Sequence, residues 1–168
     1  MTTSAATGSV SETFASVLEE KKRAFIPFIC AGDPNLDATK KALKVLDDAG
    51  ADIIELGVPY SDPLADGPVI QASATRALAN GATLNKVIDL VREVSPTIAA
   101  PIVMFTYYNP IYQRGVDAFC RDIAAAGAKG LLVPDIPLEE TYEVSEIASK
   151  HGIELVLLST PTTPVERA

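Results

Sequence analysis

The stretch ADIIELGVPYSDPLADGP, residues 51–68, joins a short apolar segment to a loop of prolines, glycines and acids. Residues 53–56 have the length and the branched side chains of a buried strand, yet they include one acid, Glu55. A carboxylate inside such a run is uncommon, because burial shifts its pKa or demands a partner. The stretch therefore predicts a buried strand that carries a polar group toward a loop rich in turn-forming residues.

The same succession of apolar run, polar loop and helical segment recurs along the chain. Apolar runs lie at 25–30, 53–56, 102–105, 131–133 and 155–158, and segments with helical spacing lie at 36–49, 69–80, 84–94, 116–126 and 139–150. This alternation predicts parallel strands joined by right-handed crossovers, an α/β fold. Ser9 and Glu12 have the spacing of a capping box and predict one more helix. We expect residues 1–10 to be a flexible leader and residues 11–168 to form one domain.

The connections differ at the two ends of the predicted sheet. The links from helix to strand are short and contain glycine, which suits the left-handed residue that ends a helix. The links from strand to helix are rich in acids, tyrosines and prolines. In parallel α/β folds the functional site lies at the carboxyl ends of the strands. We therefore expect Glu55, Asp66, Tyr107 and Asp135 at one rim.

Two architectures fit five strands of this kind, an open flavodoxin-like sheet and part of a closed eight-stranded barrel. A flavodoxin-like sheet needs a helix after its last strand. Thr163, Pro164 and Glu166 form a helix start signal, but the printed sequence ends at Ala168. This favours a partial barrel, and its open sheet edges predict a chain prone to aggregation.

Composition excludes several classes of function. The net charge of −8 disfavours binding to a nucleic acid backbone, and no apolar run approaches the roughly 18 residues of a membrane span. Cys30 and Cys120 lack the spacing of metal ligands, and the sequence has no phosphate-binding loop and no GxGxxG motif. His151, the only histidine, is placed at a helix end, which argues against a histidine-based catalytic triad.

The acids and tyrosines of the loops allow functional and purely structural interpretations. Glu55 could act as a general acid or base with a raised pKa, or it could accept hydrogen bonds from loop amides. Asp66 precedes Gly67, a common turn pair, and Asp62 is expected to form an Asx-type turn. Of Tyr107 and Tyr108, we expect one to line a pocket and the other to pack between loops.

Five longer blocks carry a family resemblance: PFICAGDP (27–34), ELGVPYSDPLADGPVIQ (55–71), FTYYNP (105–110), LLVPDIPLEE (131–140) and STPTTPVER (159–167). They resemble, in the same order, the tryptophan synthase alpha subunit family, in particular its plant-type members, and the related indole-3-glycerol phosphate lyases. The resemblance implies a TIM (β/α)₈ barrel, of which this chain would supply about the first five βα units. It also implies a lyase of tryptophan biosynthesis that cleaves indole-3-glycerol phosphate by a retro-aldol reaction to indole and glyceraldehyde 3-phosphate.

The resemblance assigns roles to four residues. Glu55 would protonate indole C3 and help to deprotonate the glycerol hydroxyl, and Asp66 would hold the indole N–H and stabilise positive charge on the ring. Tyr107 would line the substrate pocket, and Phe28 would contact indole. The two acids would do different work because one must carry a proton and the other must stay ionised.

The resemblance also implies partners and leaves alternatives open. No metal or organic cofactor is implied for this chain, since pyridoxal phosphate belongs to the beta subunit that would be its partner and would receive the indole. The expected compartment is the chloroplast stroma or the cytoplasm. A catalytically inactive, shortened relative that only binds a beta subunit is one alternative, and a stand-alone indole-3-glycerol phosphate lyase of defence metabolism is another.

Overall fold

Five parallel strands form one sheet in the computed structural model, which describes residues 8–165. The strands are β1 (Phe28–Cys30), β2 (Ile54–Gly57), β3 (Ile102–Phe105), β4 (Gly130–Leu132) and β5 (Glu154–Val156). They lie side by side in chain order, β1-β2-β3-β4-β5. A flavodoxin-like sheet would place the second strand outside the first, in the order 2-1-3-4-5, so this alternative is wrong. The order is that of consecutive units of a βα barrel, as predicted.

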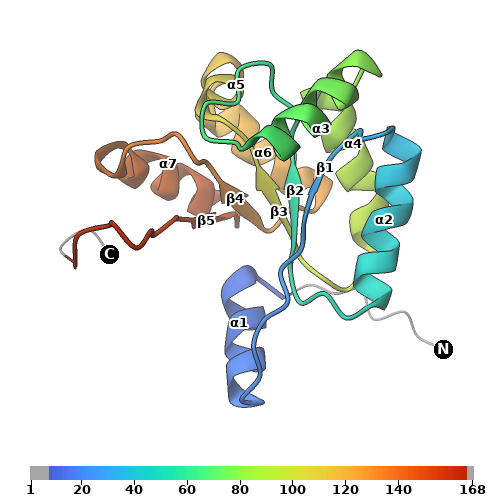
Figure 1. Cartoon of the computed structure of the whole chain (residues 1–168). Helices are drawn as coiled ribbons and strands as arrows, with labels where there is room; N and C mark the ends of the chain where they lie inside the picture. The colour runs from blue at the N-terminus through green and yellow to red at the C-terminus, as the bar shows by residue number, and fades with distance from the viewer. Residues whose placement is uncertain (1–7, 166–168) are drawn as a thin grey trace.

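Helices follow the strands and lie mostly where the sequence pattern places them (Figure 1). They are α1 (Val10–Glu19), α2 (Leu36–Asp48), α3 (Pro68–Ala79), α4 (Leu84–Val94), α5 (Tyr108–Arg114), α6 (Val116–Ala126) and α7 (Leu138–Lys150), with a 3₁₀ turn η1 (Ser95–Thr97) after α4. Helix α5 was not predicted, because its first three residues, 108–110, fall in a link from strand to helix that the sequence predicts at 106–110. The predicted helix start that includes Glu166 extends outside the described residues, and so does most of the predicted leader.

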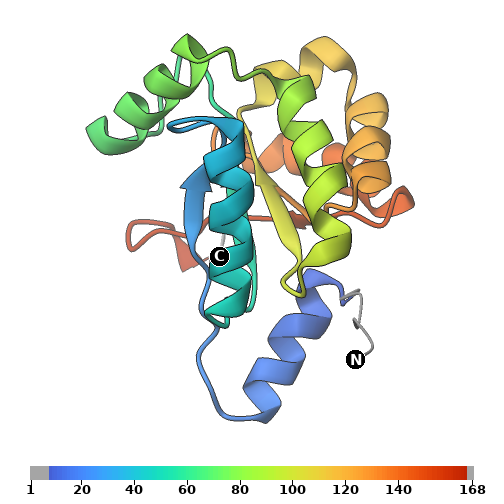
Figure 2. The same cartoon turned by 90° about the vertical axis from the view of Figure 1, so that its right-hand side faces the viewer.

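The two faces of the sheet bury different clusters of side chains. Ile54 and Leu56 of β2 belong to a large cluster that the strands share with α2, α4, α6 and α7. Ile53, Val103 and Leu132 point to the opposite face and form a smaller cluster. Side chains alternate between the faces of a strand, so the odd-numbered residues of β2 face the smaller cluster. We call the face with the smaller cluster the inner face and its cluster the inner cluster. The opposite face is the outer face, where the large outer cluster lies beneath the layer of helices (Figures 1 and 2).

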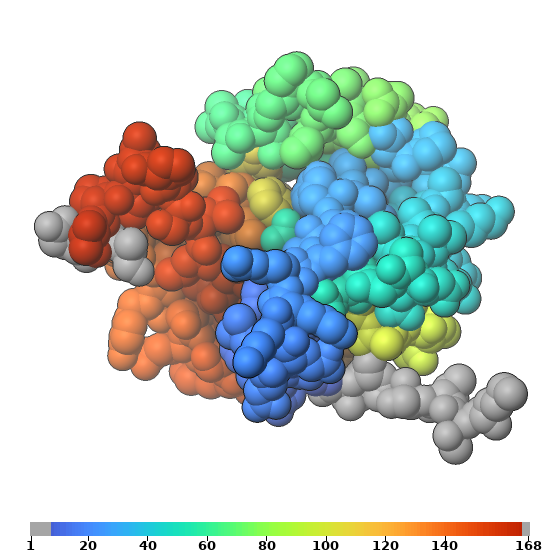
Figure 3. All heavy atoms as spheres, turned by 60° about the horizontal axis from the view of Figure 1, so that its bottom comes forward, coloured from blue at the N-terminus to red at the C-terminus, as the bar shows by residue number. Residues whose placement is uncertain are grey.

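Helix α1 lies below the strands, at the end opposite α3 and α5 (Figure 1), and the space-filling view from below shows it in front of the sheet (Figure 3). The predicted capping box of Ser9 and Glu12 is confirmed. Val10 packs into the inner cluster, where a Cβ at Gly130 would lie 3.1 Å from its Cγ2. The backbone N–H and the hydroxyl of Ser11 both donate to Glu154 Oε2, at 2.8 and 2.7 Å. The helix is therefore fixed to the amino-terminal end of β5.

Candidate functional site

Glu55 is the second residue of β2 and lies on the inner face of the sheet. Its partners in register are Phe28 of β1 and Val103 of β3. The side chain is half-buried, and burial alone raises the pKa of its carboxyl group. Within residues 8–165 no group donates a hydrogen bond to this carboxylate, so loop amides do not satisfy it. A carboxyl group with these surroundings suits proton transfer nearer to neutral pH than an exposed glutamate.

Two aromatic rings lie next to Glu55 on the inner face. Phe28 and Phe105 meet edge to face, with ring centroids 5.3 Å apart. Gly57, which pairs in register with Phe105, provides the room for the Phe28 ring: a Cβ there would lie 2.6 Å from Cζ of Phe28. The rings form an apolar surface beside the acid, of the kind that binds a flat aromatic ligand.

Asp66 lies in the loop between β2 and α3 and is held by Tyr107, which follows β3. The Tyr107 side chain is almost fully buried, at 3% exposure, and its hydroxyl accepts the Ala65 backbone N–H at 2.9 Å. The pKa of Tyr107 is raised, mainly by burial and further by its hydrogen bond to the Asp66 carboxylate. Since the Tyr107 oxygen accepts from Ala65, its own proton is available to donate to Asp66. The structure thus joins Tyr107 to Asp66 and places Phe28 beside Glu55.

Two residues that sequence reasoning did not select support this loop. Tyr60 stacks on Tyr107, with ring centroids 5.2 Å apart and an interplanar angle of 27°. The Asn109 side-chain amide donates to the Tyr60 hydroxyl at 2.9 Å. A signal was present in the sequence, because Tyr60 lies three residues after β2, and Tyr107 and Asn109 lie two and four residues after the neighbouring strand β3. The ends of adjacent parallel strands meet at one rim.

Two aspartates that follow strands, Asp33 after β1 and Asp135 after β4, have different structural roles. Asp135 accepts the backbone N–H of Tyr108 at 2.8 Å and so caps α5, a helix that does not follow it in the chain. Asp33 caps no helix. It accepts hydrogen bonds from Arg76 and Ser73 of α3, which lower its pKa to about 2. Asp33 therefore fastens the loop after β1 to the helix that follows Asp66.

Three further predictions concern residues outside the site. Asp62 forms a turn, but its backbone carbonyl rather than its carboxylate accepts the Leu64 N–H, at 3.0 Å. Tyr108 packs against the outer cluster and is the tyrosine that does not line the rim. His151 is the C-cap of α7, with Nε2 2.8 Å from Asp117 Oδ1, which confirms its place at a helix end.

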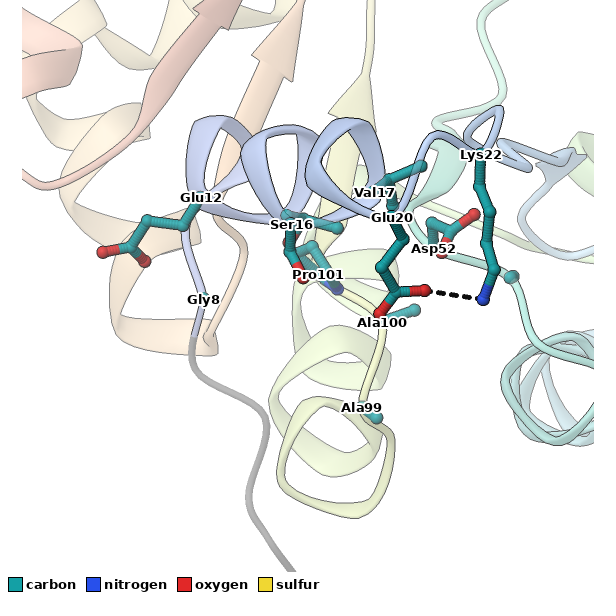
Figure 4. A pocket seen from close by; sticks show the side chains of 12 residues that line it. Gly8, Glu12, Ser16, Val17, Glu20, Lys22, Asp52, Ala99, Ala100 and Pro101 are labelled. Carbon is teal, nitrogen blue, oxygen red and sulfur yellow. Dashed lines mark ion pairs between the residues drawn. The ribbon is translucent and has the colours of Figure 1, made fainter.

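A pocket of about 410 Å³ lies at the opposite end of the sheet, under α1 (Figure 4). Its charged groups already have partners. Glu20 and Lys22 form an ion pair at 2.6 Å, Glu12 belongs to the capping box, and Asp52 accepts the Phe25 N–H at 2.7 Å. The residues that line this pocket therefore include no unpaired charged group comparable to Glu55.

Neither a candidate metal site nor a membrane-spanning helix is present among the described residues. Among its residues no group of three or more His, Cys, Asp or Glu side chains could hold a metal ion. None of its helices has both the length and the apolar character that crossing a membrane requires.

Comparisons with known proteins point to one family. Residues 14–168 match the family described as tryptophan synthase alpha chain. The chain is 60% identical over 159 residues to the tryptophan synthase alpha chain of Picosynechococcus sp., and 59% identical over 165 residues to that of Arabidopsis thaliana. These matches cover 95% and 98% of this chain but only 60% of each relative. The chain thus spans about 60% of the length of the curated relatives it matches.

Solved structures agree with this assignment. The tryptophan synthase subunit alpha of Legionella pneumophila str. Paris superposes with a TM-score of 0.91 at 39% identity, covering 96% of this chain and 62% of that one. A tryptophan synthase complex from Pyrococcus furiosus gives a TM-score of 0.82 at 46% identity, covering 86% of this chain and 59% of that one.

Proposed function

Because the chain belongs to the tryptophan synthase alpha chain family, we propose that it acts in tryptophan biosynthesis as a carbon–carbon lyase. The proposed reaction cleaves indole-3-glycerol phosphate to indole and glyceraldehyde 3-phosphate. The observation that carries the proposal is Glu55, a half-buried acid beside an aromatic surface, to which no group of residues 8–165 donates a hydrogen bond. A retro-aldol cleavage needs such a group, since one proton must leave the glycerol hydroxyl and one must reach indole C3.

In the proposed mechanism Glu55 moves the protons. Protonated Glu55 first gives its proton to indole C3, which places positive charge on the ring. The Glu55 carboxylate then takes the proton of the hydroxyl next to the breaking bond, the electron pair of the carbon–carbon bond passes to the ring, and neutral indole and the aldehyde are formed. The raised pKa of Glu55 favours this role, because a general acid works best when its pKa lies close to the working pH. Phe28 and Phe105 would contact the indole ring, for which their paired rings form an apolar surface.

Asp66 would accept the indole N–H and stabilise positive charge that develops on the ring. A carboxylate that is already in place where positive charge develops lowers the reaction barrier, because the protein does not need to reorganise during the reaction. The hydrogen bond from Tyr107 and the turn of the loop support this assignment, because they fix the carboxylate relative to β3. This reaction requires no metal and no organic cofactor.

Release of indole from indole-3-glycerol phosphate by the purified chain tests the proposal. Glu55→Gln should lower the rate by about 10²- to 10⁴-fold, the usual contribution of a general acid or base. Glu154→Gln is a matched control, because Glu154 lies in the same register row of the sheet but is bound by α1. Equal loss in both variants, or an unaffected Glu55→Gln, would contradict the assigned role.

We further propose a tryptophan synthase beta subunit as the partner. The Pyrococcus furiosus match is a tryptophan synthase complex, and two apolar side chains are exposed close together in the chain, Leu64 of the loop before α3 at 82% and Val69 of the first turn of α3 at 80%. Leu64→Glu should weaken binding to a beta subunit measured by calorimetry, whereas Val45→Glu, an exposed position on α2, should not. Binding without indole release would favour the non-catalytic alternative, and indole release that is independent of a beta subunit would favour the stand-alone lyase.

We propose the chloroplast stroma as the location, with the cytoplasm as the alternative. The support is the similarity to the Arabidopsis thaliana relative. Fractionation of source cells with detection of the protein in purified organelles tests the proposal.

A further inference from the structure

Tyr60 occupies the third position after β2, between the strand that carries Glu55 and the turn that carries Asp66. Its ring is half-buried and lies almost parallel to that of Tyr107, with the centroids 5.2 Å apart. Its hydroxyl accepts a hydrogen bond from the Asn109 amide at 2.9 Å. Tyr60 is therefore attached at both ends of its side chain to the segment that follows β3.

Tyr107 is the residue through which this attachment reaches Asp66. Its hydroxyl accepts the N–H of Ala65, the residue directly before Asp66, so its position sets that of the loop at this point. This hydrogen bond depends on where the far end of the ring lies. The Tyr60 ring stacks on Tyr107 and restricts the movement of the Tyr107 ring away from β3, because aromatic pairs prefer an offset geometry at this distance.

We propose that Tyr60 is a positioning residue for the reaction: through Tyr107 it holds in place the loop that carries Asp66. The inference deepens the proposed function and rests on it for the role of Asp66. The contacts of Tyr60 with Tyr107 and Asn109 are features of the fold and do not depend on whether the chain is active. The phenol hydroxyl contributes little to this role, because its partner Asn109 is exposed, whereas the ring face contributes most of it.

Amide hydrogen exchange at Ala65 is the first test, because that N–H bonds directly to Tyr107. Tyr60→Leu should speed its exchange by about 2- to 10-fold, the range given by an aromatic pair. Tyr60→Phe keeps the stack and should stay within about twofold of the parent chain. The Lys129 N–H, which donates to Ile102 O in the core, should exchange at an unchanged rate if the fold is intact.

Tyr112→Leu is the matched control, since Tyr112 is also a tyrosine near the rim but is 67% exposed and lies against Tyr108. It should leave the exchange of Ala65 unchanged. Unchanged exchange in Tyr60→Leu would overturn the inference, and so would an equal effect of Tyr112→Leu.

Kinetics give the second test. A misplaced Asp66 carboxylate should lower kcat by more than it raises KM, because Asp66 acts on charge that develops in the transition state. Tyr60→Leu should show this pattern and Tyr60→Phe should restore kcat. Parent-like kinetics in Tyr60→Leu would overturn the inference. If the parent chain releases no indole, the proposed function fails, and the exchange of Ala65 still decides whether Tyr60 positions the loop.

Discussion

Replacing Glu55 by glutamine should make the folded chain more stable at neutral pH, although the change removes the proposed catalytic group. The pKa of Glu55 is raised by burial, so the folded state binds its proton more tightly than the unfolded state does. The protonated group therefore contributes stability below the unfolded pKa of about 4.3, and this contribution is lost as the pH rises through the folded pKa. Glutamine has nearly the same shape and no charge, so it avoids this loss.

The size of the effect follows from the surroundings of the carboxylate. Burying a polar group without a hydrogen bond costs about 1–3 kcal/mol in proteins. Glu55 is half-buried, and within the described residues it has no donor, so we expect Glu55→Gln to raise the free energy of unfolding by about 1 kcal/mol at pH 7. For a chain of 168 residues this corresponds to an increase in Tm of about 2–4 °C. The gain should vanish near pH 4.

Glu154→Gln should have the opposite effect. Burial alone would raise the pKa of Glu154, but hydrogen bonds from Ser9 and Ser11 outweigh it and lower the pKa. Its stabilising contribution is thus present above the unfolded pKa and is lost as the pH falls through the folded pKa. Hydrogen bonds to charged acceptors contribute about 1.5–3 kcal/mol, and glutamine keeps a neutral acceptor, so we expect a loss of about 1 kcal/mol at pH 7.

Urea unfolding followed by far-ultraviolet circular dichroism, from pH 4 to pH 8, measures both effects. The sequence contains no tryptophan, which makes circular dichroism preferable to fluorescence. The difference between variant and parent at each pH isolates the one carboxylate, because all other titrating groups are shared. Destabilisation by Glu55→Gln at pH 7, or a gain that does not depend on pH, would refute the argument from burial.

Two further predictions concern stability and reactivity. Gly127→Ala should lower the free energy of unfolding in urea by at least about 1 kcal/mol more than Gly152→Ala does. Both glycines have positive φ, at +97° and +72°. A Cβ at Gly127 would lie 2.2 Å from Ser95 Oγ, whereas nothing lies within 4 Å of a Cβ at Gly152. Equal losses of stability in the two variants would contradict this prediction, because the Ser95 side chain would then move aside without a change in free energy. An aromatic disulfide reagent should react with Cys30 in the folded chain and with Cys120 only after unfolding, because Cys120 is fully buried and burial raises its pKa to about 11. Rapid reaction of both thiols in the folded chain would contradict this burial.

The strands could be predicted from the sequence because each is a run of branched residues bounded by turn formers. Helix α5 could not, since YNPIYQR has only seven residues and no long apolar period. Its first turn is stabilised by Asp135, which lies 27 positions away, and by the packing of Ile111 in the outer cluster. Both are tertiary contacts, which local patterns do not report.

The same distinction holds for the candidate site. Glu55 could be found from its place in an apolar run, and strand ends directed attention to Asp66 and Tyr107. The contact between Tyr60 and Asn109 joins residues 49 positions apart, so no local spacing reports it, and only their placement after neighbouring strands points to it. It follows from the register of β2 with β3, which aligns the ends of the two strands.

The two faces of the sheet bury separate clusters, and this explains how the sheet tolerates Glu55, an acid with no hydrogen-bond donor among the described residues. Most buried side chains belong to the outer cluster, which the sheet shares with its helices, whereas the inner cluster is small. Glu55 lies on the inner face, so its charge is removed from the packing that contributes most of the apolar burial. Glu154 lies in the same register row, but α1 satisfies it with hydrogen bonds. Of these two acids in one row, the one bound by the helix stabilises the fold, and the one left unbound is available for proton transfer.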